Sequence, residues 1–379
     1  VIEPLPVPQG GPAAPAEIEE IAALIAKAER PLLIAGGGGL GTARGRRALL
    51  AVSEAHALPV VLTFKRQDYF PNAHPNYAGH LGFKIAKAAV ERYLEADLIV
   101  AAGTRLGEVS TQGFTLPASP VPRQPLIHVH DDPRQLGRNY SAAKALLADP
   151  AAVLEALARV PGKVPPARAQ WIRKLNDPVA RAIPWTAPAD GLLDMGPVVA
   201  ALARRLARDA ILVTDAGNFS GWLHRHFPFS GEHVLIGCVG GAMGIGMPAA
   251  VAAALRFPGR QVVNFVGDGG ALMTGGELAT AVQYGAKVKT FISNNGSYAT
   301  IRMHQEIAYK GRVHGTDLRN PDFAKWAESF GALGLTIASI EEAAGVVEQA
   351  LAEDGPVVVD VKTAVEHITP FATITALRG

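Results

Sequence analysis

Two short apolar runs, each followed at once by small or polar residues, constrain the fold of this chain more than any other feature. Residues 262–266 run into Gly-Asp-Gly-Gly at 267–270, and residues 288–293 run into Asn-Asn at 294–295. Such runs predict buried strands, and the stretch 276–284 between them predicts a helix. Parallel strands joined by a right-handed crossover end at the same edge of a sheet. The sequence therefore predicts an open α/β sheet in this half of the chain.

The two strand ends carry the groups of a cation site. Asp268 supplies a carboxylate and Asn295 supplies an amide oxygen, and the glycines beside Asp268 let backbone N–H groups approach a ligand. Oxygen ligands of this kind suit a Mg2+ ion that holds a diphosphate. The alternative is an ordinary strand–turn–helix unit whose polar residues only cap the turn. We favour the cation site because the pattern extends over both strand ends.

This stretch resembles the signature of thiamine-diphosphate (ThDP) enzymes, in which Gly-Asp-Gly is followed at a set distance by Asn-Asn. The resemblance implies that Asp268, Asn295 and the backbone carbonyl of Ser297 bind the metal. It also implies that neighbouring small residues contact the cofactor, namely Gly267, Gly269, Gly270 and Gly296.

A second motif, Gly-Gly-Ala-Met-Gly-Ile-Gly-Met-Pro-Ala-Ala at 240–250, resembles a loop of the acetohydroxyacid (acetolactate) synthase group. In that group a large apolar side chain, here Met243, lies under the cofactor and bends it. The backbone carbonyl at the position of Gly241 binds the cofactor's amino group. Ala242, and the pair Gly217-Asn218 after an earlier predicted strand, are further cofactor contacts by the same resemblance. The alternative for Met243 is an ordinary core position.

Apolar runs that alternate with helical stretches indicate two Rossmann-like open parallel-sheet domains. We expect a linker at 1–15, a central domain at 16–160, a connector at 161–193 and a diphosphate-binding domain with a closing tail at 194–379. The predicted strands lie at 32–35, 60–62, 98–102, 126–129, 211–214, 234–236, 262–266, 288–293 and 357–361.

The same resemblance implies a partner domain. Related ThDP enzymes have an N-terminal pyrimidine-binding domain before these two, and its activating glutamate has no counterpart here. We therefore expect the chain to be a fragment of a longer polypeptide and inactive alone. Because the family places its cofactor between subunits, the intact enzyme is expected to be a homodimer or homotetramer.

Composition and charge exclude several classes of protein. Hydrophobic residues make up 49% and charged residues 18%, which indicates a large core rather than disorder. Lys and Arg number 36 against 34 Asp and Glu, so nucleic acid and membrane surfaces are not expected partners. A single cysteine, Cys238, suits a reducing compartment, and we expect a cytoplasmic protein. The uncharged stretch 234–255 could span a membrane, but its glycines and Pro248 favour a strand, a loop and a helix.

The first domain carries motifs typical of nucleotide sites. A glycine turn at 36–41 fits a dinucleotide fingerprint, but Thr-Phe-Lys at 63–65 stands where an acidic ribose contact is expected, which argues against NAD. Acetohydroxyacid synthases bind FAD here through a similar glycine turn and segments similar to 103–105 and 128–137. His130 replaces an aspartate of that pattern. FAD binding therefore stays open beside a central domain without flavin, which we favour.

The resemblance implies decarboxylation of a small 2-oxo acid followed by carboligation, as in acetolactate synthase, with ThDP and Mg2+ as cofactors. Simple decarboxylation of a 2-oxo acid or an acyl-CoA is the alternative within the family. An NAD-linked oxidoreductase and a non-catalytic ThDP-domain protein are the alternatives outside it.

The substrate side of the resemblance departs from the synthases of branched-chain precursors. Those enzymes have a tryptophan where Met303-His304-Gln305 stands here, so we expect little selectivity between short acceptors. His304 is a candidate proton donor to the substrate, with a solvated helix histidine as the alternative.

Overall fold

The computed structural model describes residues 10–83, 85–176 and 183–379. The chain forms two compact units, and each is described by itself. The first unit contains the described residues up to 176 together with the short segment Phe229–Gly231, and the second contains the other residues from 183 onward. Most of the predicted linker at 1–15, and residues 177–182 of the predicted connector, lie outside the described residues.

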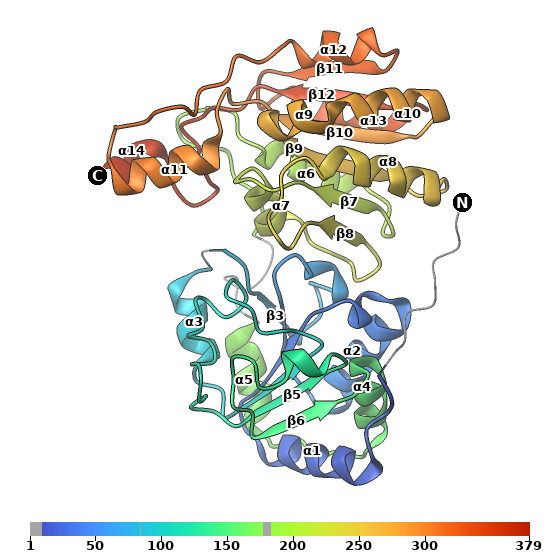
Figure 1. Ribbon diagram of the computed structural model, residues 1–379, viewed down its shortest axis with the longest axis vertical. Helices are drawn as coiled ribbons and strands as arrows, with labels where there is room; N and C mark the ends of the chain where they lie inside the picture. The colour runs from blue at the N-terminus through green and yellow to red at the C-terminus, as the bar shows by residue number, and fades with distance from the viewer. Residues whose placement is uncertain (1–9, 84, 177–182) are drawn as a thin grey trace. The chain divides into compact units, whose positions relative to one another are not determined.

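The first unit is built on a parallel sheet with strand order β3-β2-β1-β4-β5-β6 (Figure 1). Its strands are β1 Pro31–Ala35, β2 Val60–Leu62, β3 Tyr77–His80, β4 Leu98–Ala102, β5 Leu126–His130 and β6 Lys144–Leu147. Its helices are α1 Pro15–Lys27, α2 Ala43–Ala55, α3 Lys87–Tyr93, α4 Pro150–Arg159 and α5 Ala167–Leu175, with short 3-10 turns η1 Gly39–Gly41, η2 Gln67–Tyr69 and η3 Pro133–Gln135.

Helices cover both faces of this sheet. Along β1, Leu33 and Ala35 pack into a cluster with α1, α2 and α4, whereas Leu32 and Ile34 pack into a cluster with α3 and α5. A parallel sheet that is buried on both faces needs apolar side chains at every position of its inner strands. This requirement explains why the inner strands stand out in the sequence as continuous apolar runs.

Helix α5 lies within the stretch predicted as a connector, yet it packs on the first unit. Arg168 near its start is fully buried and donates hydrogen bonds to the backbone carbonyls of Ile25 (2.6 Å) and Ala28. Trp171 donates from Nε1 to the carbonyl of Pro31 at 2.8 Å. The last carbonyls of a helix have no hydrogen-bond partner within the helix and interact favourably with a cation. Arg168 therefore caps the carboxyl end of α1.

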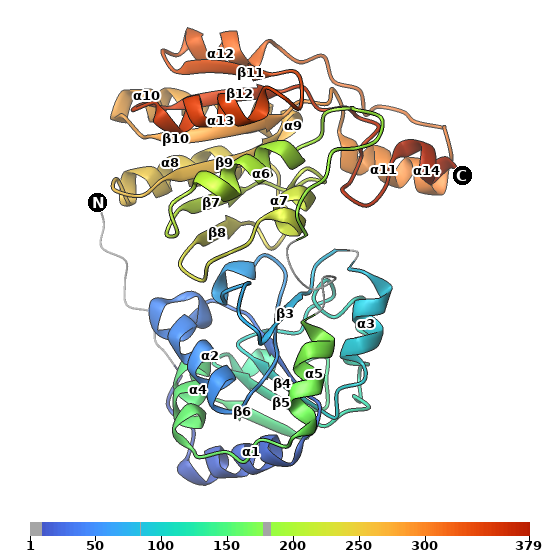
Figure 2. The ribbon, with the colours of Figure 1, turned by 180° about the vertical axis from the view of Figure 1, so that it is seen from behind.

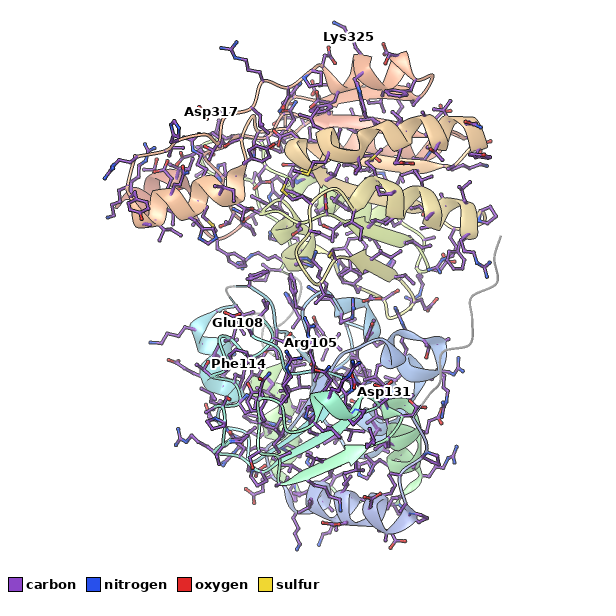
Figure 3. All side chains as sticks on the ribbon, in the orientation of Figure 1. Arg105, Glu108, Phe114, Asp131, Asp317 and Lys325 are labelled. Carbon is purple, nitrogen blue, oxygen red and sulfur yellow. The ribbon has the colours of Figure 1, made fainter. Side chains whose placement is uncertain are left out.

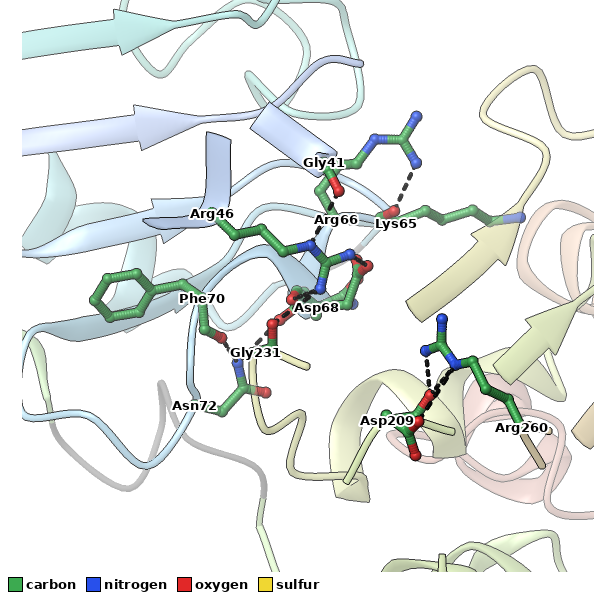
Figure 4. Close-up of polar contacts among 11 residues, drawn as sticks. Gly41, Arg46, Lys65, Arg66, Asp68, Phe70, Asn72, Asp209, Gly231 and Arg260 are labelled. Atoms are coloured by element: carbon green, nitrogen blue, oxygen red, sulfur yellow. Dashed lines mark hydrogen bonds and ion pairs between the residues drawn. The ribbon is translucent and has the colours of Figure 1, made fainter. Parts of the chain in front are cut away.

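A buried ion pair holds the segment after β2 in the first unit (Figure 4). Arg46 on α2 pairs with the carboxylate of Asp68 and also donates to the carbonyls of Gly41 and Gly231, both at 3.1 Å. The N–H of Asn72 donates to the carbonyl of Phe229 at 2.9 Å, and the N–H of Phe229 donates to the side-chain oxygen of Asn72 at 3.0 Å. These contacts explain why residues 229–231 belong to this unit.

The second unit is a parallel sheet with strand order β11-β12-β10-β9-β7-β8 (Figure 1). Its strands are β7 Ile211–Thr214, β8 Val234–Gly237, β9 Val262–Gly267, β10 Val288–Ser293, β11 Leu333–Ile337 and β12 Val357–Val361. Its helices are α6 Gly196–Arg205, α7 Ser220–His226, α8 Gly246–Arg256, α9 Asp268–Thr274, α10 Leu278–Tyr284, α11 Ala299–Ala308, α12 Phe323–Ser329, α13 Ala343–Ala352 and α14 Ile374–Arg378, with a 3-10 turn η4 Gly275–Glu277.

Both faces of the second sheet are also buried. Val262 and Val266 of β9 pack with α8, α10 and α12 on one face. On the other face Phe265 stacks on Phe291 of β10, with ring centroids 6.1 Å apart, and α6 packs against α13 (Figure 2). Helices α11 and α14 contact each other beside the carboxyl edge of the sheet. The predicted fold class, two Rossmann-like parallel-sheet domains, is confirmed.

Besides α5, the structure departs from the predicted elements at three strands and at the start of one helix. Strands β3, β6 and β11 were not predicted, and all three have a neighbour on one side only. Strands β6 and β11 are partly exposed, and β3 is short and contains glycine and histidine, so none of the three has the continuous apolar run that marks an inner strand. The helix predicted at 276–284 is preceded by α9, which begins at Asp268 directly after β9, so Gly269 and Gly270 lie in a first helical turn rather than in an open loop.

Gly285 ends α10 in the left-handed conformation, with φ of 63°, as glycine commonly does at the end of a helix. The expectation for the uncharged stretch is also met. The stretch 234–255 forms β8, a loop and α8 with Pro248 in the first turn. Within the described residues, no helix combines the length and the apolar character that crossing a membrane requires.

Candidate functional site

A cavity of about 220 Å³ lies at the carboxyl edge of the second sheet. Its walls come from the segments that follow β7, β8, β9, β10 and β12, which are neighbours in the sheet, and from Asp194 and Met195 before α6. The chain passes from β7 to β8 on one side and then to β9 on the other, so the strand order reverses beside β7. Open α/β sheets bind ligands at such a reversal, outside the carboxyl ends of the strands.

Most of the predicted site residues meet in this cavity. The lining contains Gly217, Asn218, Gly241, Met243, Gly267, Asp268, Gly269, Gly270, Asn295 and Ser297. Three predicted residues, Ala242, Gly296 and His304, are not among the lining residues that the structure describes. Gly296 still contacts the site, because its N–H donates to a carboxylate oxygen of Asp268 at 2.8 Å.

The Asp268 carboxylate is buried at the start of α9, with 3% of the residue exposed. Its Oδ1 accepts a hydrogen bond from the N–H of Gly269 at 2.9 Å, and its Oδ2 accepts from Gly296 and from the Asn320 side chain, both at 2.8 Å. Burial raises the pKa of Asp268, and these hydrogen bonds act against that shift. A cation bound at this carboxylate would offset the same burial cost.

The other two predicted ligands lie on the turn after β10. Asn295 Oδ1 accepts a hydrogen bond from the N–H of Ser297 at 3.0 Å, which folds the turn back on itself. The hydroxyl oxygen of Ser297 is buried and has no hydrogen-bond partner among the described residues. An unsatisfied buried oxygen beside a buried carboxylate suits a site that is completed by a ligand. The residues present therefore fit a hard cation with oxygen ligands.

The loop that carries Met243 is held by hydrogen bonds to Asp215, which directly follows β7. The fully buried carboxylate accepts hydrogen bonds from the N–H groups of Gly244 (2.7 Å) and Ile245 (3.3 Å). Thr274 on α9 donates to the carbonyl of Gly244 at 2.8 Å. Gly244 has a φ of 84°, which favours glycine. This fastening leaves Met243 39% exposed on the cavity wall, where an apolar side chain can support a bound ring.

Two further contacts shape the cavity. Asn218 accepts a hydrogen bond from the Thr300 hydroxyl at 3.1 Å through its side-chain oxygen, which ties the β7 end to α11. A Cβ at Gly269 would lie 2.5 Å from a ring carbon of Tyr298. The glycine therefore lets the Tyr298 ring pack against the first turn of α9.

A histidine lies on the cavity wall at a place that the predicted site does not include. His367, from the tail after β12, lines the cavity, and its Nε2 lies 3.0 Å from both carboxylate oxygens of Asp190. Hydrogen bonds from the N–H of Leu192 and from His367 lower the pKa of Asp190. By contrast, His304 is exposed on α11, and its role as a proton donor stays a prediction.

Two side chains, those of Asn320 and Asp215, support the site in ways that the sequence did not predict. Asn320 lies on the segment between α11 and α12, where Figure 3 labels the nearby Asp317, and nothing in its surroundings resembles a binding motif. Asp215 precedes Gly217-Asn218 in a segment that resembles a family loop near the diphosphate, but no role was predicted for Asp215 itself. Only the contacts of the folded chain show that these two side chains hold the site together.

In the first unit, the segments that resemble an FAD site come together at the carboxyl edge of the sheet. A Cβ at Gly37 would lie 1.8 Å from the carbonyl oxygen of Gly103, so the glycine turn packs directly on the 103–105 segment. His130 accepts a hydrogen bond from the N–H of Asp132 at 2.9 Å and thus bonds within its own turn. Arg105 and Asp131, labelled in Figure 3, are exposed at this edge. FAD binding stays a prediction.

Comparison with known protein families shows which family the chain belongs to. Residues 18–157 match the model of the central domain of thiamine pyrophosphate enzymes, and residues 215–361 match the model of their C-terminal TPP-binding domain. Thiamine pyrophosphate is another name for ThDP. The chain therefore belongs to the thiamine pyrophosphate enzymes and contains their central and C-terminal domains.

Three curated relatives show which members of this family the chain resembles. The chain is 32% identical over 348 residues to YdaP of Bacillus subtilis, described as thiamine pyrophosphate-containing, covering 89% of this chain and 57% of the relative. It is 32% identical over 359 residues to an acetolactate synthase of Mycobacterium bovis, covering 91% and 57%. It is 34% identical over 373 residues to an acetolactate synthase large subunit of Parasynechococcus marenigrum, covering 95% and 59%. The chain thus spans little more than half the length of these relatives.

Proposed function

We propose that this chain is the catalytic core of a Mg2+- and ThDP-dependent enzyme that decarboxylates a small 2-oxo acid and joins the product to a second carbonyl compound, as acetolactate synthase does. One observation carries the proposal. Asp268, Asn295, Ser297 and Met243 line a single cavity at the carboxyl ends of adjacent strands. The named acetolactate synthases among its relatives support the choice of reaction.

Different residues of the cavity would bind different parts of the cofactor. Asp268, Asn295 and the backbone of Ser297 would hold the cation and through it the diphosphate, while Met243 would support the thiamine ring. When bound, ThDP supplies the electron sink that lets CO2 leave a 2-oxo acid. The apolar walls formed by Met243 and Ile368 would keep water away from the reacting atoms.

The substrate end of the cavity supports a small substrate. His304 stands at the tryptophan position of the branched-chain synthases and is exposed on α11, outside the described cavity lining. Met303 beside it is 5% exposed and packs with Ile368 and Ile374 in the core beneath α11. We propose that pyruvate or a similar short 2-oxo acid is the donor and that the enzyme discriminates little between short acceptors.

The whole protein is proposed to be longer than this chain. A pyrimidine-binding domain would complete the cavity, and two or four subunits would share their sites. We also propose a cytoplasmic location, which rests on the single cysteine.

The cation site is tested by calorimetry of ThDP binding, with and without Mg2+, on the full-length protein. Asp268→Ala should abolish Mg2+-dependent binding, because it removes the only charged ligand of the set, and Asn295→Ala should weaken it less. Asp354→Ala, which removes an exposed carboxylate of the same unit, serves as the control. Unchanged ThDP affinity in Asp268→Ala would overturn the cation site.

The reaction is tested by NMR of products formed from pyruvate alone and from pyruvate with 2-oxobutyrate. Release of CO2 together with an acetolactate-type product supports carboligation. Aldehyde without that product would favour simple decarboxylation, and no turnover of any short 2-oxo acid would refute the proposed donor.

A further inference from the structure

The amide of Asn320 bridges two oxygens beside the predicted cation site. Its Nδ2 donates to Oδ2 of Asp268 and to Oδ1 of Asn294, both at 2.8 Å. Asn320 lies outside the predicted ligand set, and so does Asn294, the first residue of the Asn-Asn pair. A side chain that touches a metal ligand without binding the metal can still decide how that ligand is oriented.

Chemistry determines which end of the Asn320 amide faces Asp268. An ionised carboxylate only accepts hydrogen bonds, so it requires a donor. Asn294 uses its own Nδ2 to donate to Oδ1 of Asp360 at 2.9 Å, which turns its oxygen toward Asn320. Asn320 therefore faces two acceptors, and only its nitrogen satisfies both.

The contacts continue as a chain of polar groups across the sheet. Asp360 on β12 is fully buried and also accepts from Lys362 Nζ at 2.6 Å, which balances its charge. Lys362, Asp360, Asn294, Asn320 and Asp268 thus form one connected network. The nitrogen of Asn320 is paired twice in this network, whereas its buried Oδ1 has no hydrogen-bond partner among the described residues.

The backbone around Asn320 is held against the turn that carries the predicted ligands. The N–H of Leu318 donates to the carbonyl of Gly296 at 2.8 Å, and the N–H of Tyr298 donates to the carbonyl of Thr316 at 2.8 Å. These bonds form an antiparallel bridge between Ser297 and Asp317. Main-chain pairing therefore holds the segment that leads to Asn320 against the turn after β10.

The carboxylate of Asp268 is left with unequal oxygens. Its Oδ2 accepts from both Gly296 and Asn320, whereas its Oδ1 accepts from Gly269. A carboxylate oxygen has two acceptor directions, so Oδ1 is the oxygen with more capacity for a cation.

We propose that Asn320 is a positioning residue for the cation site: it occupies one oxygen of Asp268 and so presents the other to the metal, and Asn294 and Asp360 hold Asn320 in place. This inference rests on the proposed binding of Mg2+ and ThDP. It gives separate roles to the paired asparagines, with Asn295 as a ligand and Asn294 as a support.

The test compares Asn320→Leu with Asn320→Ala in the full-length protein. Leucine has the same branched outline of side-chain heavy atoms as asparagine but cannot donate, whereas alanine removes both the outline and the donor. The measurement is the Mg2+ concentration that gives half-maximal ThDP binding, followed by calorimetry, with thermal unfolding as the check on folding. We expect both variants to raise that concentration about 10- to 100-fold. At saturating Mg2+ the ThDP affinity should return to that of the parent protein.

Two controls sharpen the test. Asn264→Ala removes another buried amide on β9 that contacts Met247 and Thr290 and not Asp268. It should leave the Mg2+ requirement unchanged. If Asn294 acts through Asn320, Asn294→Ala should raise the Mg2+ requirement on its own and add little in the presence of Asn320→Ala.

The outcomes separate the two proposals. A parent protein without Mg2+-dependent ThDP binding overturns the proposed function and this inference with it. A parent that binds, with a normal Mg2+ requirement in Asn320→Leu, overturns the inference alone. Loss in Asn320→Ala but not in Asn320→Leu shows a packing role and overturns it as well.

Discussion

The buried carboxylate of Asp215 accepts a 2.7 Å hydrogen bond from the N–H of Gly244, which lies 29 positions further along the chain. Gly244 is the residue directly after Met243. The bond joins the end of β7 to the loop before α8. It holds the backbone next to Met243, whose apolar side chain lies on the cavity wall.

Removal of this carboxylate is expected to loosen the loop. Asp215→Ala should lower the free energy of unfolding by about 1–3 kcal/mol, because the N–H groups of Ala216, Gly244 and Ile245 lose a carboxylate acceptor. ThDP binding should weaken, while its Mg2+ requirement stays the same. Asp215→Asn keeps one acceptor oxygen and should have a smaller effect. Urea unfolding and calorimetry provide the measurements, and parent-like ThDP affinity in Asp215→Ala would contradict the argument.

Two glycines that follow β9 offer a matched pair for a steric test. A Cβ at Gly269 would meet the Tyr298 ring at 2.5 Å, whereas a Cβ at Gly276 has no atom within 4 Å. Gly269→Ala should destabilise the protein by about 1–3 kcal/mol through overpacking and should weaken ThDP binding. Gly276→Ala should be neutral or slightly stabilising. Equal unfolding midpoints for the two variants would show that Tyr298 moves aside freely.

The carboxylate of Glu306 on α11 is the basis of a pH prediction. Arg378 on α14 donates to both of its oxygens, at 2.8 and 2.7 Å, and these bonds lower the pKa of Glu306 to about 2. A pKa that is lower in the folded state contributes stability above the ordinary value of 4.5, and that contribution is lost as the pH falls toward 2.

Glu306→Gln should therefore reduce stability by about 1–2 kcal/mol near neutral pH and should have less effect near pH 3. Urea unfolding of both proteins at the two pH values gives the comparison. Glu328→Gln, at an exposed position of α12, is the control. A difference between parent and Glu306→Gln that does not change with pH would contradict the assigned ion pair.

Two histidines compete for the role of proton donor. His367 lines the cavity and is held by Asp190, whereas His304 is exposed on α11. We expect His367→Ala to change the ratio of aldehyde to acetolactate-type product, with little change in ThDP affinity. His304→Ala should change this ratio less. Product analysis by NMR decides between them, and the opposite order would favour the residue predicted from the sequence.

The sequence was sufficient for the central part of each sheet. Inner strands such as β9 and β10 need apolar residues on both faces, and this need leaves continuous runs that can be read without any structure. Glycine, proline and asparagine at the strand ends act on the backbone beside them, so the turns around Asp268 and Asn295 were also predictable.

Only the tertiary structure decided the rest. The edge strands β3, β6 and β11 form because a neighbour offers hydrogen bonds, and their own side-chain patterns do not require a strand. His367 lines the cavity from the tail after β12, Asn320 holds Asp268, and Asp215 holds the loop beside Met243, and none of these three roles was predicted from the sequence. Local patterns report interactions over a few residues, whereas these side chains act through contacts between distant parts of the chain. Such contacts exist only once the sheet has brought those segments to one edge.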